Sequence, residues 1–123
     1  MELIEISKQI HNRINDLSRG RTLIAKRAKT KAEAISHYEK MLAITMLKLK
    51  NEAIPEFEGE AIEKLPATLI EKIAKGICWR EKMESDLATD EYKAAVVGME
   101  SLKAELNGYQ SMNKYLEHDI GGK

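Results

Sequence analysis

The sequence predicts an all-α protein, built as a long helical hairpin or an elongated bundle, and three observations indicate this fold class. Strong helix formers dominate both halves of the 123 residues. With only 7 glycines and 2 prolines, the chain lacks the many turns that an all-β fold needs. Apolar residues also recur at alternating spacings of three and four, the pattern of helices that pair along a coiled-coil-like seam.

The first half is expected to form one long helix over about residues 2–51. Its seam is predicted from two sets of positions, each with a period of seven. The first set is Leu3, Ile10, Leu17, Ile24, Lys31, Tyr38 and Thr45, and the second is Ser7, Ile14, Arg21, Ala28, Ile35, Leu42 and Leu49. The seam is weak between Arg21 and Lys31, and Gly20 costs roughly 1 kcal/mol in a helix interior. A kink near residues 18–22 is therefore an alternative to a continuous helix.

The middle of the chain is expected to hold a connector over about residues 52–65, since both prolines, Pro55 and Pro66, lie near it. A short helix is predicted at about residues 66–75. Proline is favourable in the first turn of a helix, and Gly76 suits a C-terminal cap.

A second long helix is predicted over about residues 77–119, with a break at Ser85–Thr89 as the alternative, because Ser, Asp and Thr there suit an N-cap. Its seam is regular and comprises Ala88, Tyr92, Ala95, Met99, Leu102, Leu106, Tyr109, Asn113, Leu116 and Ile120. Gly98 and Gly108 indicate either the close approach of another backbone or tolerated strain. Asn113 is either a buried polar residue that fixes the register of the helices or a solvent-facing one.

The predicted helices are too long for one compact globule. A fifty-residue helix is about 75 Å long, whereas a compact domain of this size has a radius of gyration of about 14 Å. Each helix of a hairpin buries only a strip, so leftover seam residues need a second chain. A homo-oligomer is therefore expected through Tyr92, Met99, Leu102, Leu106, Tyr109 and Leu116. The alternative is a shorter three- or four-helix bundle, kinked at Gly20 and Ser85.

Several classes of protein are excluded by what the sequence lacks. No apolar run approaches 18 residues, so no membrane span is expected, and the N-terminus lacks the pattern of a signal peptide. A single cysteine, Cys78, gives no disulfide framework and suits a reducing compartment such as the cytoplasm. No motif for a catalytic, metal or cofactor site is present. The sequence thus predicts a protein that is not an enzyme, with Cys78 as a buried structural thiol.

Charge is distributed unevenly, although the formal net charge is zero. Residues 8–31 carry a net charge of +7, residues 52–63 carry −5 and residues 81–91 carry −4. Bases on an exposed helix bind the phosphates of nucleic acid, and the same bases can pair with the acidic segments, within the chain or across an oligomer. The residues predicted to contact phosphates are Arg13, Arg19, Arg21, Lys26, Arg27, Lys29 and Lys31.

Two segments resemble small all-helical phage and prophage proteins from recombination and replication regions. They are RTLIAKRAKTKAEAISHYEKMLAITMLKLKN and the stretch that begins PATLIEKIAKGICWREKMESDLATDEYKAAVVGM. The layout of a basic N-terminal helix, a loop and a long C-terminal assembly helix is similar to the T4-type recombination mediators. That resemblance implies ring-like oligomers that help to load a recombinase on single-stranded DNA. The zero net charge and the acidic segments depart from the family pattern.

These observations lead to one principal hypothesis and two alternatives. The principal hypothesis is a non-enzymatic, phage-type accessory protein of DNA recombination or replication, which binds nucleic acid through the basic helix and assembles through its seams. The first alternative is a protein-binding inhibitor or adaptor, for example of a host defence or replication system, that uses the acidic segments. The second is a purely structural assembly protein.

Overall fold

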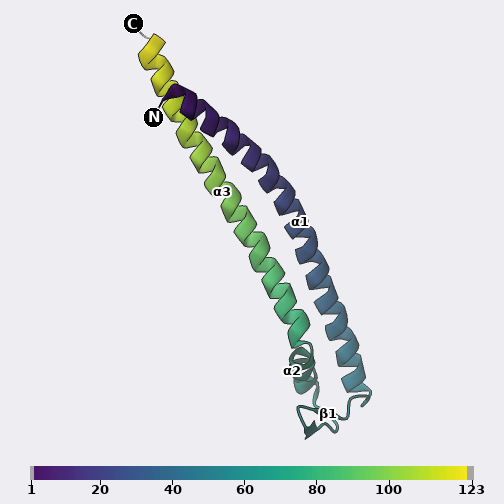
Figure 1. Cartoon of the computed structure of the whole chain (residues 1–123). Helices are drawn as coiled ribbons and strands as arrows, with labels where there is room; N and C mark the ends of the chain where they lie inside the picture. Colours follow the sequence, from purple (N-terminus) through teal and green to yellow (C-terminus); the bar gives the residue numbers. More distant parts are fainter. Residues whose placement is uncertain (1, 122–123) are drawn as a thin grey trace. The chain divides into compact units, whose positions relative to one another are not determined.

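The computed structural model describes residues 2–121, and the prediction of an all-α fold is confirmed. Helix α1 (Leu3–Lys50) is followed by two short strands, β1 (Glu56–Phe57) and β2 (Glu60–Ala61). Helix α2 (Ala67–Ile77) and helix α3 (Trp79–Gly121) complete the order of elements, which Figure 1 labels along the chain.

Both long helices are continuous, so neither of the breaks considered from the sequence occurs. α1 passes through Gly20 without interruption. α3 passes through Ser85–Thr89, where Ser85 is buried and the Thr89 hydroxyl donates a hydrogen bond of 2.9 Å to the Ser85 carbonyl. Serine and threonine hydroxyls satisfied in this way sit inside a helix instead of capping a new one.

The predicted connector contains a β-hairpin that the sequence pattern did not reveal. Strands β1 and β2 are antiparallel, with Glu56 opposite Ala61 and Phe57 opposite Glu60. Glu58 and Gly59 form the two-residue turn with φ values of 51° and 80°. Two successive positive φ angles are the mark of a tight hairpin turn whose twist matches that of the strands, and glycine adopts this backbone without strain.

Helix α2 begins one residue later and ends two residues later than predicted. Pro66 has extended backbone angles and precedes the first helical residue. Gly76 lies inside the last turn and is not the cap, which is Cys78. The reason for a glycine at this position is steric. A Cβ on Gly76 would lie 2.9 Å from Cζ of Phe57, so the small residue allows the β1 ring to pack on α2.

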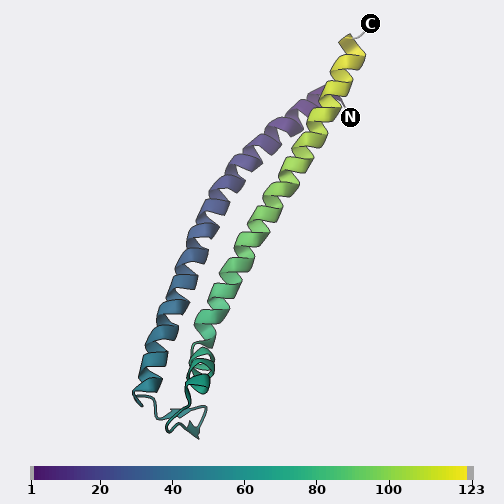
Figure 2. The same ribbon diagram turned by 180° about the vertical axis from the view of Figure 1, so that it is seen from behind.

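The chain divides into two compact units. The terminal unit comprises Met1–Ala28 and Glu91–Lys123, and the hairpin unit comprises Lys29–Asp90. In the terminal unit, the N-terminal part of α1 lies beside the C-terminal part of α3, as both views show (Figures 1 and 2). The two helices run antiparallel, because Arg13 pairs with Glu105 whereas Arg27 pairs with Glu91.

The buried residues of the terminal unit show that part of the predicted seam of α1 was wrong by one position. Ile6 is fully buried, and Arg13, Gly20 and Arg27, each seven residues further on, are half-buried. The predicted residues Ser7, Ile14 and Arg21 are exposed instead. The error has a physical cause, since arginine and glycine occupy the true seam positions and give no hydrophobic signal.

The predicted seam of α3 coincides with its less exposed face. Ala88 and Met99 are buried, and the other seam positions from Tyr92 to Leu116 are half-buried; the Ile120 side chain lies outside the described residues. Asn113 is half-buried, and its amide donates a hydrogen bond of 3.1 Å to Glu117 on the same helix. No residue of the described chain comes within 4 Å of a Cβ built on Gly98 or Gly108. Close approach within this chain therefore explains neither glycine, and it is Gly20 that packs tightly, with its added Cβ 3.3 Å from Met99 Sδ.

The hairpin unit has its own small core. Leu49 at the end of α1, Ala74 on α2 and Ala88 on α3 are buried there. Cys78 is 2% exposed, and its Sγ lies 3.4 Å from Oγ1 of the buried Thr45. The thiol therefore fills space between α1 and the start of α3 and completes the hydrogen bonding of a buried hydroxyl.

Replacing Cys78 with alanine should lower the free energy of unfolding by about 1–2 kcal/mol, because apolar contacts are lost and Thr45 loses its partner. Urea denaturation followed by circular dichroism measures this change. Nucleic-acid affinity should be unchanged in the folded variant. A variant with unaltered stability and abolished binding would mean that the thiol has a chemical role.

Candidate nucleic-acid interface

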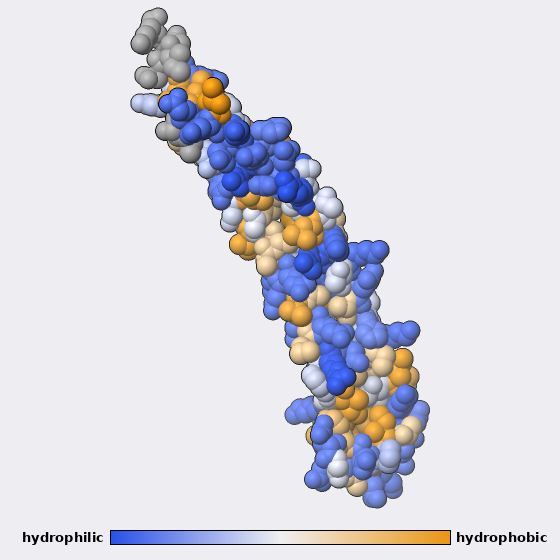
Figure 3. All heavy atoms as spheres, viewed as in Figure 1, coloured by the Kyte–Doolittle hydropathy of each residue, from blue (hydrophilic) through white to orange (hydrophobic). Residues whose placement is uncertain are grey.

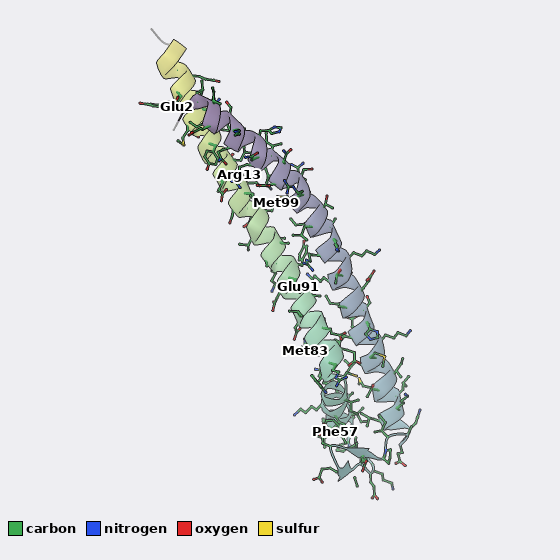
Figure 4. All side chains as sticks on the ribbon, in the orientation of Figure 1. Glu2, Arg13, Phe57, Met83, Glu91 and Met99 are labelled. Atoms are coloured by element: carbon green, nitrogen blue, oxygen red, sulfur yellow. The ribbon has the colours of Figure 1, made fainter. Side chains whose placement is uncertain are left out.

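The predicted basic residues of the terminal unit fall into two groups, and the first group faces α3. Arg13 Nε lies 3.2 Å from Glu105 Oε2, and Arg13 Nη1 lies 3.0 Å from Asp16 Oδ2. Arg27 Nη1 lies 3.0 Å from Glu91 Oε2. Figure 4 shows Arg13, Glu91 and Met99 in this unit. These two arginines are engaged by carboxylates of the same chain, so they are less available to an outside ligand.

The second group is exposed to solvent, with Arg19 and Lys26 on the side of α1 away from α3 and Arg21 on another side. Arg19, Arg21 and Lys26 are exposed, and the side chain of Arg19 is 79% accessible although it also lies 3.5 Å from Asp16. Lys26 interacts with another residue as well. Lys8, which was not among the predicted contact residues, is exposed too.

Arg19 and Lys26 belong to a continuous polar face, here called the outer stripe. Successive members are four or three residues apart, which places them on one side of a helix. All are exposed, and they are Lys8, Asn12, Asn15, Arg19, Thr22 and Lys26. At 1.5 Å per residue, the stripe is about 27 Å long. Figure 3 shows a mainly hydrophilic surface over this part of α1.

The outer stripe contains no carboxylate. Between Ser7 and Lys26 the sequence has one acidic residue, Asp16, and its side chain is only 31% accessible. Asp16 is held by Arg13 at 3.0 Å and Arg19 at 3.5 Å, which offset its charge. The outer stripe itself therefore presents only positive or neutral hydrogen-bonding groups to a ligand.

The two remaining predicted residues belong to the hairpin unit. Lys29 is 80% accessible and lies 4.0 Å from Glu33, one turn further along α1. Lys31 is half-buried and interacts with another residue. Neither belongs to the outer stripe.

The acidic segments behave differently from one another. Glu91 pairs with Arg27, as described above, so the segment at residues 81–91 does neutralise part of the basic stretch. In the same segment, Asp86 lies 3.0 Å from Lys82 and raises the pKa of that amine through a hydrogen bond and charge attraction. Within the described residues, no ion pair involves the exposed glutamates of the connector, which are Glu52, Glu56, Glu58, Glu60 and Glu63.

The residues predicted to mediate oligomerisation lie on the seam of α3. Met99 is buried, and Tyr92, Leu102, Leu106, Tyr109 and Leu116 are half-buried. Met99 and Leu102 are the residues nearest to a Cβ built on Gly20, so this part of the seam already packs on α1 of the same chain. Assembly through these residues stays a prediction.

Comparisons with known proteins place no relative beside this chain: no family model, curated protein or solved structure matches it. In the part of the chain that the structure describes, no group of three or more His, Cys, Asp or Glu side chains is arranged to hold a metal ion. None of the described helices combines the length and the apolar character that crossing a membrane requires.

The sequence revealed the basic segment but not the face that carries the exposed charge. A count of charges does not include the uncharged members of the stripe, which are Asn12, Asn15 and Thr22. Their place beside Arg19 and Lys26 becomes visible only when the inward face of α1 is known. The spacing of four and three from Lys8 onward was the available signal.

Proposed function

We propose that this chain is a non-enzymatic accessory protein that binds nucleic acid through the outer stripe of α1. The observation that carries the proposal is the absence of carboxylates from the exposed helical face between Lys8 and Lys26, which holds Lys8, Arg19 and Lys26. The resemblance of the sequence to phage recombination and replication proteins supports DNA as the nucleic acid and recombination or replication as the process.

The chemistry of the outer stripe suits phosphate groups better than base edges. Lysine and arginine neutralise phosphates and release condensed counterions, which makes the binding strongly dependent on salt. Asparagine and threonine side chains donate hydrogen bonds to phosphate oxygens and do not by themselves read the sequence. A helix that uses these groups binds many sequences with similar affinity. Binding that relies on the three basic side chains of the stripe gives a salt slope near −2.7 for duplex DNA.

Replacing both Arg19 and Lys26 with glutamine should weaken binding to every DNA sequence alike. Two lost phosphate contacts should reduce the salt slope by about 1.4 for single strands and about 1.8 for duplexes. Fluorescence anisotropy with labelled DNA, from about 50 mM to 200 mM salt, measures both the affinity and the slope. Arginine, lysine and glutamine have similar helix propensities, so α1 should remain folded.

The matched control replaces Lys93 and Lys103 with glutamine. Both lysines are exposed on α3 within the terminal unit, so the control removes the same charge from the other helix. The control should retain the wild-type slope. Equal losses of DNA affinity in the two variants would show that net charge alone governs binding. If the wild-type protein had no DNA affinity at about 50 mM salt, the proposal would be wrong.

A second candidate function is that of a protein-binding inhibitor or adaptor. It is favoured by the five exposed connector glutamates, for which the described ion pairs provide no internal partner. These residues belong to the hairpin unit, whereas the outer stripe belongs to the terminal unit. If the protein shows no affinity for DNA but binds a basic polypeptide in a salt-dependent manner, this candidate would be favoured.

A further inference from the structure

The hairpin unit contains an apolar groove that the proposed binding of nucleic acid does not use. Its volume is about 740 Å³, within the range of sites that hold ligands. One wall is the last part of α1, with Met46, Leu47 and Leu49, and the other is formed by Leu65, Ala67 and Ile70 at the start of α2. Figure 3 shows hydrophobic side chains gathered over these elements on the face that it presents.

The apolar side chains at the groove are incompletely covered by the chain itself. Leu47 is 61% exposed, although it lies among the apolar residues of the groove. The lining residues Met46, Leu65 and Ile70 are half-buried. Removing such apolar surface from water is favourable and scales with the area that is covered. A partner that covers the groove would therefore bind by removing this exposed apolar surface from water.

The charge beside the groove indicates the kind of partner. The segment that joins its two walls is the acidic connector, which begins with the lining residue Glu52 and carries four more exposed glutamates. Two lysines, Lys50 and Lys64, also line the groove. The lining thus holds two lysines and one glutamate, whereas residues 50–65 as a whole carry five glutamates and two lysines, a net charge of −3. The segment that borders the groove therefore favours a partner with positive charge.

The shape of the groove indicates a helix. Both walls are largely helical, and a third helix packs well into the furrow between two others. A helix in a groove presents apolar side chains at spacings of three and four and keeps its polar face outward. We propose that this groove binds an amphipathic helix of a partner protein, with leucine-like side chains between α1 and α2 and lysine or arginine side chains beside the connector glutamates.

The test uses the full chain and two synthetic peptides. The first is an amphipathic helix with leucine at i, i+3, i+4 and i+7 and lysine at the outward positions; the second has glutamate in place of every lysine. Fluorescence anisotropy should show binding of the lysine peptide that weakens as salt rises. Leu47→Glu should reduce the affinity by about tenfold or more, because it places a carboxylate in the apolar contact.

Leu87→Glu is the matched control. Leu87 is 58% exposed on α3 in the hairpin unit and does not line the groove. This variant should bind the lysine peptide as the wild type does, and circular dichroism should show both variants folded. The double variant Glu58→Gln, Glu60→Gln should bind the lysine peptide more weakly than the wild type, and α1 should remain folded.

Three results would overturn the proposal: no binding of the lysine peptide, equal effects of Leu47→Glu and Leu87→Glu, or tighter binding of the glutamate peptide. The first excludes the groove as a helix site, the second shows non-specific adhesion, and the third refutes the charge argument. The outer stripe lies in the other unit, so its DNA-binding test gives its result independently. Either proposal can therefore fail without the other.

Discussion

Replacing Met99 with aspartate should unfold the terminal unit or destabilise it by several kcal/mol. Met99 is 6% exposed, and its Sδ and Cε atoms lie 3.3 and 3.4 Å from the position of a Cβ on Gly20. A carboxylate there would lose its water without gaining a partner, and the shorter side chain would leave a cavity beside the glycine. Urea denaturation followed by circular dichroism measures the loss.

Val97→Asp is the control for this experiment. Val97 lies two residues away on α3 and is 60% exposed, so an aspartate there stays hydrated. Its cost should not exceed about 1 kcal/mol, which covers the change in helix propensity and the lost surface contacts. If the two aspartate variants proved equally stable, Met99 would not be part of a packed interface between α1 and α3.

Replacing Gly76 with valine should destabilise the hairpin unit by about 1–3 kcal/mol, because overpacking forces side chains or backbone to move. A Cβ at this position would lie 2.9 Å from Phe57 Cζ and 3.3 Å from Phe57 Cε1. The gain in helix propensity from glycine to valine offsets only part of this cost. The ring must leave its place on α2, and the β-hairpin loses its anchor.

Phe57→Leu supplies the test of this explanation. A leucine side chain is shorter than the aromatic ring and relieves the clash with valine. The double variant should therefore be more stable than the sum of the two single effects predicts, by about 0.5 kcal/mol or more, as expected for residues in contact. Strict additivity of the two substitutions would show that Phe57 and Gly76 do not interact in solution.

The parts of the fold that the sequence predicted are those with a strong periodic signal. The seam of α3 is composed almost entirely of Ala, Leu, Met and Tyr, so its burial follows from spacing alone. The seam of α1 is interrupted by Arg13 and Gly20, which give no hydrophobic signal, and the heptad pattern chose their exposed neighbours Ile14 and Arg21 instead. Strands of two residues are too short to show an alternation of apolar and polar residues. The turn sequence Glu58-Gly59 was therefore the available sign of the hairpin.

The candidate interface was predictable in composition and not in detail. A net charge of +7 over residues 8–31 is visible without any structure. Which of these bases face α3 depends on the register of α1, and the predicted register was one residue off at Ser7, Ile14 and Arg21. Arg13 and Arg27 were thus grouped with Arg19 and Lys26, although the structure gives the first two carboxylate partners on α3.

The two arginines that pair with α3 also make the alignment of the helices unique. Arg13 and Arg27 are two heptads apart, and so are their partners Glu105 and Glu91. If α3 slid by one heptad, a glycine, Gly98, would replace a glutamate opposite one arginine. Slid in one direction, Arg27 would lose its carboxylate, and in the other Arg13 would keep only Asp16 of its own helix. The apolar seam repeats every seven residues and distinguishes the two alignments less sharply, so the ion pairs with Glu105 and Glu91 favour the observed register.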